Sequence, residues 1–133
     1  VEDAEIGRRY LPGQWIDAAG LSRDDYAAPR HRETLAGVVK RLVDLAEGYE
    51  ASARFGTPAL PLRSAWAVLA AAGIYGGIGL KVRAGGATAL AHRVSTSTPQ
   101  KLGIVAASYA AALSRSRRWP SPGPSRTGLW TRP

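Results

Sequence analysis

Apolar residues recur at three- and four-residue spacing along most of the chain, and this spacing predicts helices. The clearest run covers residues 30–55. Its apolar side is formed by Leu35, Val38, Val39, Leu42, Ala46, Tyr49 and Ala53. Gly56 and Pro58 are expected to end this helix. No stretch shows the strict alternation typical of a strand, so the predicted fold class is all-α.

The segment before this helix predicts shorter elements. Residues 13–19 can form a short helix, closed by Gly20 in the left-handed conformation. Ser22, followed by Asp24 and Asp25, predicts a further helix start, because a serine cap and early carboxylates suit the positive end of a helix.

A second long helix is expected over residues 62–82, and residues 64–80 within it carry no charge. This uncharged run is at the short limit for a membrane span and is rich in alanine and glycine rather than leucine. We therefore predict a buried helix that is packed on all sides. Small side chains there would allow neighbouring helices to approach closely or leave room for an apolar ligand.

The pattern breaks at Gly85-Gly86 and resumes in a third helix over residues 98–114. Thr98 is the expected cap of this helix and Pro99 its first position. Residues 114–133 are rich in arginine, serine and proline, which predicts a disordered basic tail that is separate from the domain over residues 1–113.

Charge is distributed unevenly along the chain, whose net charge is +8. All ten acidic residues lie within positions 1–50, whereas positions 51–133 contain only basic charges. Six of these cations precede the tail: Arg54, Arg63, Lys81, Arg83, Arg93 and Lys101. They require an anionic partner, which can be a phosphate group, the acidic first part of the chain or nucleic acid.

Composition excludes several kinds of site. The chain has no cysteine, so it has neither disulfides nor thiolate metal sites. Its two histidines, His31 and His92, lie far apart, which argues against a zinc site. The glycines at positions 73–79 follow no predicted strand, as a nucleotide-binding loop would require. They indicate a loosened helix beside Tyr75.

The first residues combine acids, bases and an aromatic ring. Glu2 and Asp3 fit an acidic helix surface, but carboxylates also bind Mg²⁺ when a diphosphate supplies further oxygen ligands. Arg8 and Arg9 fit a solvated turn, but they also fit a guanidinium fork that contacts diphosphate oxygens.

Asp3, followed by Arg8-x-Tyr10-x-Pro12, resembles the end of the second signature of the squalene and phytoene synthase family. In that family an Asp-x-x-x-Asp motif leads into Arg-x-aromatic-x-Pro. Weaker similarities follow in the same order over roughly residues 1–113: Leu60-Pro61, Arg63, Tyr75, Lys81, Arg93 and Lys101-Leu102. The first aspartate of the motif would precede Val1, so we expect a C-terminal fragment that is inactive alone.

The resemblance implies the C-terminal helices of an isoprenoid synthase fold and a prenyltransferase. Within the family, residues 7–22 are similar to the bacterial carotenoid branch, which condenses two geranylgeranyl diphosphates head to head into phytoene through a cyclopropyl intermediate. The alternative is squalene or dehydrosqualene formation from farnesyl diphosphate. The resemblance also implies a cytoplasmic monomer with peripheral membrane association and no nucleic-acid partner.

The resemblance further assigns site residues. Asp3 and Glu2 are expected to bind Mg²⁺, or Mn²⁺, which bridges to the substrate diphosphate, and no NADPH is expected. Arg8, Tyr10, Tyr75 and Arg93 are expected to contact diphosphate, with Asp3 and Arg8 as the catalytic residues. Positive groups that stabilise a departing diphosphate are the electrostatic part of such catalysis.

Two other classes of function remain open. The pI of about 10.6 permits a basic helical nucleic-acid binder, although no helix combines clustered cations with a known recognition motif. A non-catalytic helical scaffold is the second alternative, and it predicts no stabilisation by Mg²⁺ and diphosphate.

Overall fold

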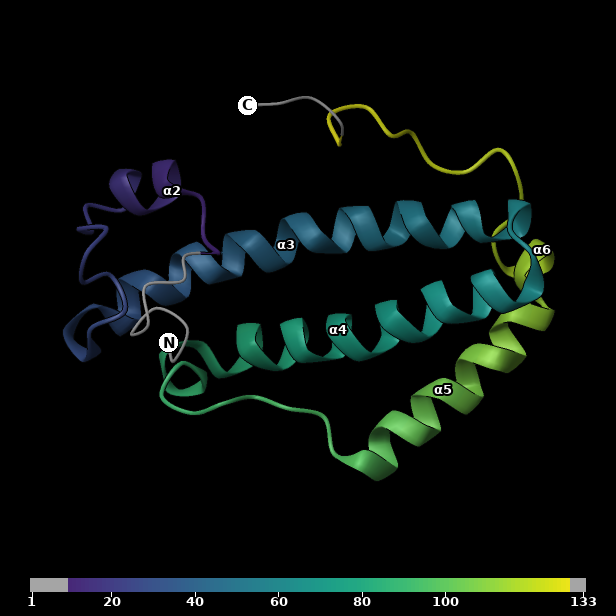
Figure 1. Ribbon diagram of the computed structural model, residues 1–133. Coiled ribbons are helices and arrows are strands. Elements are labelled where there is room, and N and C mark those ends of the chain that lie inside the picture. The colour runs from purple at the N-terminus through teal and green to yellow at the C-terminus, as the bar shows by residue number, and fades with distance from the viewer. Residues whose placement is uncertain (1–9, 130–133) are drawn as a thin grey trace. The chain divides into compact units, whose positions relative to one another are not determined.

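The computed structural model describes residues 10–129, and all regular elements in this part of the chain are helical (Figure 1). The all-α prediction is therefore confirmed. The elements in chain order are α2 (Gly13–Ala18), the 3₁₀ turn η1 (Pro29–His31), α3 (Arg32–Gly56), the 3₁₀ turn η2 (Thr57–Ala59), α4 (Leu62–Ala89), α5 (Thr98–Leu113) and α6 (Arg115–Arg118).

The chain divides into two compact units. Unit 1 comprises residues 1–44 and 79–95, and unit 2 comprises residues 45–78 and 96–133. The long helices α3 and α4 each contribute one half to each unit. Each unit has its own small apolar cluster, so the two are described separately.

Unit 1 is built around Ile16, Leu21, Tyr26 and Leu35, which are all buried. Gly20 has φ of 71°, which confirms the predicted left-handed residue after the first helix. This conformation turns the chain so that the amide of Leu21 donates to the carbonyl of Ile16 at 3.1 Å. As a result, Leu21 enters the same cluster as Ile16.

The helix start predicted at Ser22 is wrong. Residues 23–27 form turns, and the hydroxyl of Ser22 accepts a hydrogen bond from the amide of Asp24 at 3.3 Å. The long helix begins only at Arg32, after Pro29. Proline disfavours helical geometry at the residue before it, and Ala28 is accordingly extended, with ψ of 146°.

Helix α4 is longer and less covered than the sequence indicated. It reaches Ala89, but Gly86 breaks the helical geometry with φ of 50°, which confirms the predicted break. The expectation that this helix is packed on all sides is wrong for the described residues, because only Ala65 and Leu69 are buried. Among those residues, α4 is also the one helix long and apolar enough to cross a membrane.

Unit 2 is held by contacts between α4 and α5. Ala65, Leu69 and Ala112 form its buried cluster. The indole nitrogen of Trp66 donates to the carbonyl of Val105 at 2.9 Å, and its ring lies edge-on to Tyr109 with centroids 5.3 Å apart. The Trp66–Val105 hydrogen bond joins two residues that are 39 positions apart in the sequence.

The start of α5 lies one residue from the predicted position. Ser97, not Thr98, is the cap: its hydroxyl accepts from the amide of Gln100, and the Gln100 side chain accepts from the Ser97 amide at 3.2 Å. This reciprocal arrangement satisfies two helix-end amides at once. Ser97 is therefore the N-cap of α5, and Thr98 is the first residue of the helix.

The predicted tail boundary near residue 114 remains a prediction, but several residues beyond it make defined contacts within unit 2. Arg115 donates to the carbonyls of Ala112 at 2.8 Å and Leu60 at 3.3 Å. Trp119 packs against the buried cluster of this unit. The chain then continues to Leu129, whose carbonyl accepts from the hydroxyl of Tyr49.

Candidate functional site

Three of the six predicted site residues are placed by the structure. Glu2, Asp3 and Arg8 lie outside the described residues, so their predicted roles remain predictions. Tyr10 and Arg93 belong to unit 1 and Tyr75 to unit 2. All three side chains are exposed, Tyr75 by 72% and Tyr10 by 70%.

Neither Tyr10 nor Arg93 has a hydrogen-bond or ion-pair partner among residues 10–129. Arg93 lies in the connection between α4 and α5, where its guanidinium is open to a ligand from solvent. Five fixed N–H donors make an exposed arginine well suited to an anionic oxygen cluster. The arrangement is compatible with diphosphate contact, but the structure does not bring Tyr10 and Arg93 into contact.

A polar contact joins the two long helices within unit 1. The carboxylate of Asp44 on α3 pairs with Lys40 at 2.7 Å and with Arg83 on α4 at 3.0 Å. The hydrogen bond from Lys40, and then that from Arg83, lowers the pKa of Asp44 from its ordinary value. The i, i+4 spacing of Lys40 and Asp44 is visible in the sequence, whereas the pairing with Arg83 is not.

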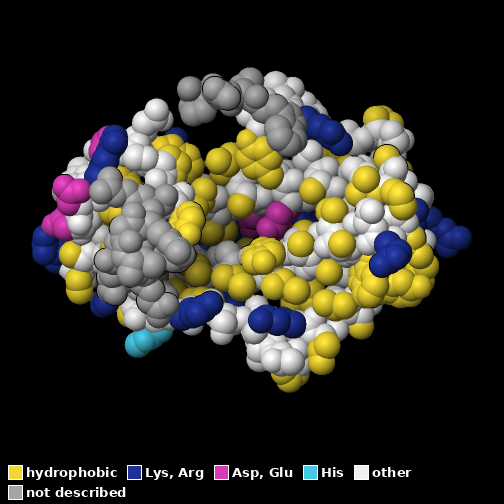
Figure 2. All heavy atoms as spheres, viewed as in Figure 1, with side chains coloured by type: hydrophobic (Ala, Val, Ile, Leu, Met, Phe, Trp, Pro, Cys, Tyr) yellow, Lys and Arg dark blue, Asp and Glu magenta, His cyan; other side chains and the backbone are white. Residues whose placement is uncertain are grey.

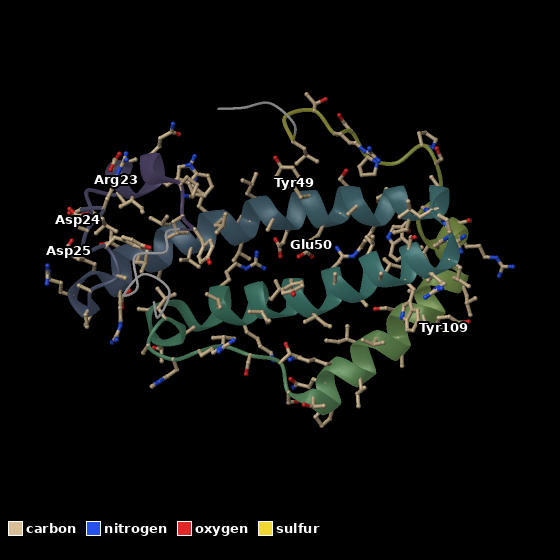
Figure 3. All side chains as sticks on the ribbon, viewed as in Figure 1. Arg23, Asp24, Asp25, Tyr49, Glu50 and Tyr109 are labelled. Carbon is tan, nitrogen blue, oxygen red and sulfur yellow. The ribbon has the colours of Figure 1, made fainter. Side chains whose placement is uncertain are left out.

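A second carboxylate lies on the α3 half of unit 2. Glu50 pairs with Arg54 at 3.3 Å, and its side chain points from α3 toward α4 (Figure 3). Its oxygens lie so close to Gly76 that a Cβ added there would be 2.5 Å from Glu50 Oε2. Residue 76 therefore admits the carboxylate because it has no side chain, and this contact leaves no periodic signal in the sequence.

Unit 1 also has a shallow cavity of about 270 Å³, which the sequence did not indicate. It lies between α2 and α3, and its walls include Trp15, Val38 and Arg41. The Arg41 guanidinium is 4.3 Å from the centroid of the Trp15 ring, a cation–π distance. Tyr10, Tyr75 and Arg93, the predicted site residues that the structure describes, do not line this cavity. Its mostly apolar walls suit a small apolar group.

The model of the squalene/phytoene synthase family matches residues 1–100. The chain belongs to this family. The matched range includes Asp3, Arg8, Tyr10 and Pro12, the residues that resemble the family signature.

Relatives extend the family match through the predicted tail. The chain is 49% identical to a 15-cis-phytoene synthase of Enterobacter agglomerans and 47% identical to one of a Paracoccus species, in both cases over its whole length. It spans 44% and 42% of those relatives, respectively. Residues 114–133 are thus part of the similarity, whereas the family motifs in the sequence extend only over roughly residues 1–113. No solved structure matches the chain.

The charge pattern of this family member is partly explained by its own acids. Of the six cations that required an anionic partner, Arg54 pairs with Glu50 and Arg83 with Asp44. Arg63, Arg93 and Lys101 meet no acid among residues 10–129. These three remain the cations that are open to a phosphate-bearing ligand.

Potential metal-ligating side chains are dispersed over the described part of this synthase-family chain. Residues 10–129 contain no group of three or more histidine, aspartate or glutamate side chains that could hold an ion. Asp44 and Glu50 are each engaged with cations rather than with one another. The predicted metal ligands Glu2 and Asp3 lie outside this part of the chain.

Replacing Asp44 by asparagine is expected to lower stability at neutral pH, because Lys40 and Arg83 each lose an ion pair with its carboxylate. A carboxyl with a depressed pKa stabilises the fold above its unfolded pKa and loses this effect as pH falls through its folded pKa. Since that pKa is lowered below 3.8, the difference between Asp44→Asn and the parent should vanish only in strong acid.

Urea unfolding from pH 7 to pH 2 measures this difference. Glu33→Gln is the matched control, since Glu33 is exposed and has no partner among the described residues. A constant difference between Asp44→Asn and the parent across this range would show that the charge of Asp44 is not the cause.

Proposed function

We propose that this chain is part of a prenyltransferase that condenses two molecules of geranylgeranyl diphosphate head to head into phytoene. The observation that carries the proposal is the 49% identity, over the whole chain, to a protein described as 15-cis-phytoene synthase. Because the chain spans 44% of that relative, the proposed activity is that of a full-length enzyme to which these helices contribute.

In this proposal Arg8, Tyr10, Tyr75 and Arg93 contact the diphosphate groups. The exposure of Arg93 and Tyr75 supports such roles, because both side chains are free to meet a ligand. The lack of any described acid beside Arg93 adds further support. The positive field of a guanidinium that is not offset by a neighbouring carboxylate is available to stabilise a departing diphosphate.

The metal belongs to the same proposal and rests on the family alone. Glu2 and Asp3 would hold Mg²⁺, or Mn²⁺, together with diphosphate oxygens. When bound, the ion neutralises negative charge that develops on the leaving diphosphate. No NADPH is proposed, because phytoene formation ends with the loss of a proton rather than with a reduction.

The remaining features of the proposal are the cellular setting and the assembly. We propose a cytoplasmic monomer that associates peripherally with membranes, where its isoprenoid substrate and product are soluble. The absence of acids after Glu50 is compatible with attraction to an anionic lipid surface. Farnesyl diphosphate remains the alternative substrate.

A chimera tests the proposed activity. In the Enterobacter agglomerans relative, the 134 matched residues are replaced by this chain, and conversion of labelled geranylgeranyl diphosphate is measured with Mg²⁺. We expect phytoene from the chimera and none from the 133-residue chain alone. Arg93→Ala should lower turnover by about 100-fold if this guanidinium stabilises the diphosphate.

Arg126→Ala is the matched control for this assay, because it removes an exposed arginine of the tail and should leave turnover unchanged. Dehydrosqualene from farnesyl diphosphate, with no phytoene, would instead support the alternative substrate. A folded chimera without either product would refute the proposal.

A further inference from the structure

Helix α5 has two apolar faces, only one of which is used within unit 2. The inner face contacts α4: Ala112 lies in the buried cluster with Ala65 and Leu69. A Cβ on Gly73 of α4 would lie 2.7 Å from Ile104 Cγ2, which shows how closely the two helices approach. This contact accounts for one side of α5 only.

The outer face of α5 carries a second apolar row that is mostly exposed, although its Tyr109 also lies edge-on to Trp66 of α4. Leu102, Ala106, Tyr109 and Leu113 follow one another at spacings of four, three and four residues, so they share one side of the helix. Leu102 is 65% exposed, Leu113 60% and Tyr109 44%. We call these four residues the α5 stripe.

Figure 2 shows hydrophobic side chains gathered over this part of the molecule. Residues 98–113 contain one charged side chain, Lys101, and no acid. A helix that is apolar on all sides is usually buried rather than solvent-facing. Contiguous exposed apolar side chains of this kind mark a surface that another apolar surface covers.

We propose that the α5 stripe is an interface covered by an apolar helix from the part of a full-length synthase that this chain does not match. Four relatives match the entire chain, and the chain spans only 42% to 44% of their lengths. More than half of each relative is therefore available to supply the covering helix.

The charges near the stripe favour this occupant over a lipid surface. A helix that lies on an anionic membrane carries a row of lysine and arginine beside its apolar face. Here Lys101 lies at the start of the stripe and Arg115, Arg117 and Arg118 lie beyond its end, with no cation at positions 102–113. An uncharged helical surface fits such a stripe better than a layer of anionic headgroups.

Two variants of the stripe test the interface in the same chimera. Leu102→Glu and Leu113→Glu each place a carboxylate in the α5 stripe, and thermal unfolding is compared in the chain alone and in the chimera. Because both leucines are mostly exposed in the chain alone, their replacement should hardly change its Tm there. In the chimera each should lower Tm by about 5 °C or more, since the charge would be buried.

Ser116→Glu is the matched control, because it adds the same charge to an exposed position after α5 and should shift neither Tm. Equal shifts in the chain alone and in the chimera would overturn the proposal. An unchanged chimera Tm combined with Leu102-dependent binding to phosphatidylglycerol vesicles would assign the stripe to a lipid surface instead.

A dimer of the chimera that Leu102→Glu converts to a monomer, without a change in Tm, would assign the stripe to a second copy. The inference rests on the proposed function in one respect only: the covering helix is taken from the unmatched part of a full-length synthase. Its readout is stability, so a chimera that makes no phytoene but shows the Tm pattern would refute the proposed function while it supports the interface.

Discussion

Replacing Ile16 by alanine is expected to lower the free energy of unfolding by about 2–5 kcal/mol, the range for truncating a fully buried aliphatic side chain. Ile16 is 1% exposed and packs with Leu21, Tyr26 and Leu35. The cluster of unit 1 is small, so few neighbours can move to fill the space that the substitution leaves. Urea unfolding followed by circular dichroism measures the loss.

Leu80→Ala is the matched control, because Leu80 belongs to the same unit but is 45% exposed. It should lower the free energy of unfolding by less than about 1 kcal/mol. Ile16→Val should fall between the two, at about 0.5–1.5 kcal/mol. A loss for Ile16→Ala no greater than that for Leu80→Ala would mean that this cluster does not determine the stability of unit 1.

The helices could be predicted from the sequence because their signals are local. The apolar spacing over residues 30–55 predicted α3, found at Arg32–Gly56. The start of α4 at Leu62 and the break at Gly86 also followed from apolar spacing and glycine placement. The errors lie at helix starts. A helix was predicted to begin at Ser22, but the chain becomes helical only from Pro29. Thr98 was predicted to cap α5, but Ser97 is the cap.

Coverage of a helix could not be predicted in the same way, because it depends on what packs against each face. The uncharged run of α4 is apolar on all sides, which predicted burial, yet Tyr75 is 72% exposed. Composition shows that a face is apolar but does not show which part of a protein covers it. The same limit applies to the exposed side of α4 and to the α5 stripe: the sequence shows that both are apolar but not what covers them.

The candidate site was predictable only where residue types follow a linear motif. Asp3, Arg8, Tyr10 and Pro12 lie within ten residues of one another, so the family signature is visible without a structure. The Asp44–Arg83 pair joins residues 39 positions apart, and the closeness of Glu50 to Gly76 depends on how α3 and α4 face each other. Such contacts depend on tertiary packing, not on spacing along the chain.

The two glycines of α4 at positions 73 and 77 should respond in opposite directions to alanine. A Cβ on Gly77 meets nothing within 4 Å, so Gly77→Ala should raise the free energy of unfolding by about 0.5–1 kcal/mol through helix propensity. A Cβ on Gly73 would lie 2.7 Å from Ile104 Cγ2, so Gly73→Ala should instead lower it by about 1–3 kcal/mol.

A double-mutant cycle identifies the cause of the Gly73 effect. Ile104→Ala removes the methyl group that a Cβ at position 73 would meet, so Gly73→Ala should cost less in that background than in the parent. The coupling should favour the double variant by about 1 kcal/mol or more. Additive losses would show that position 73 of α4 and Ile104 of α5 do not approach as closely as this contact requires.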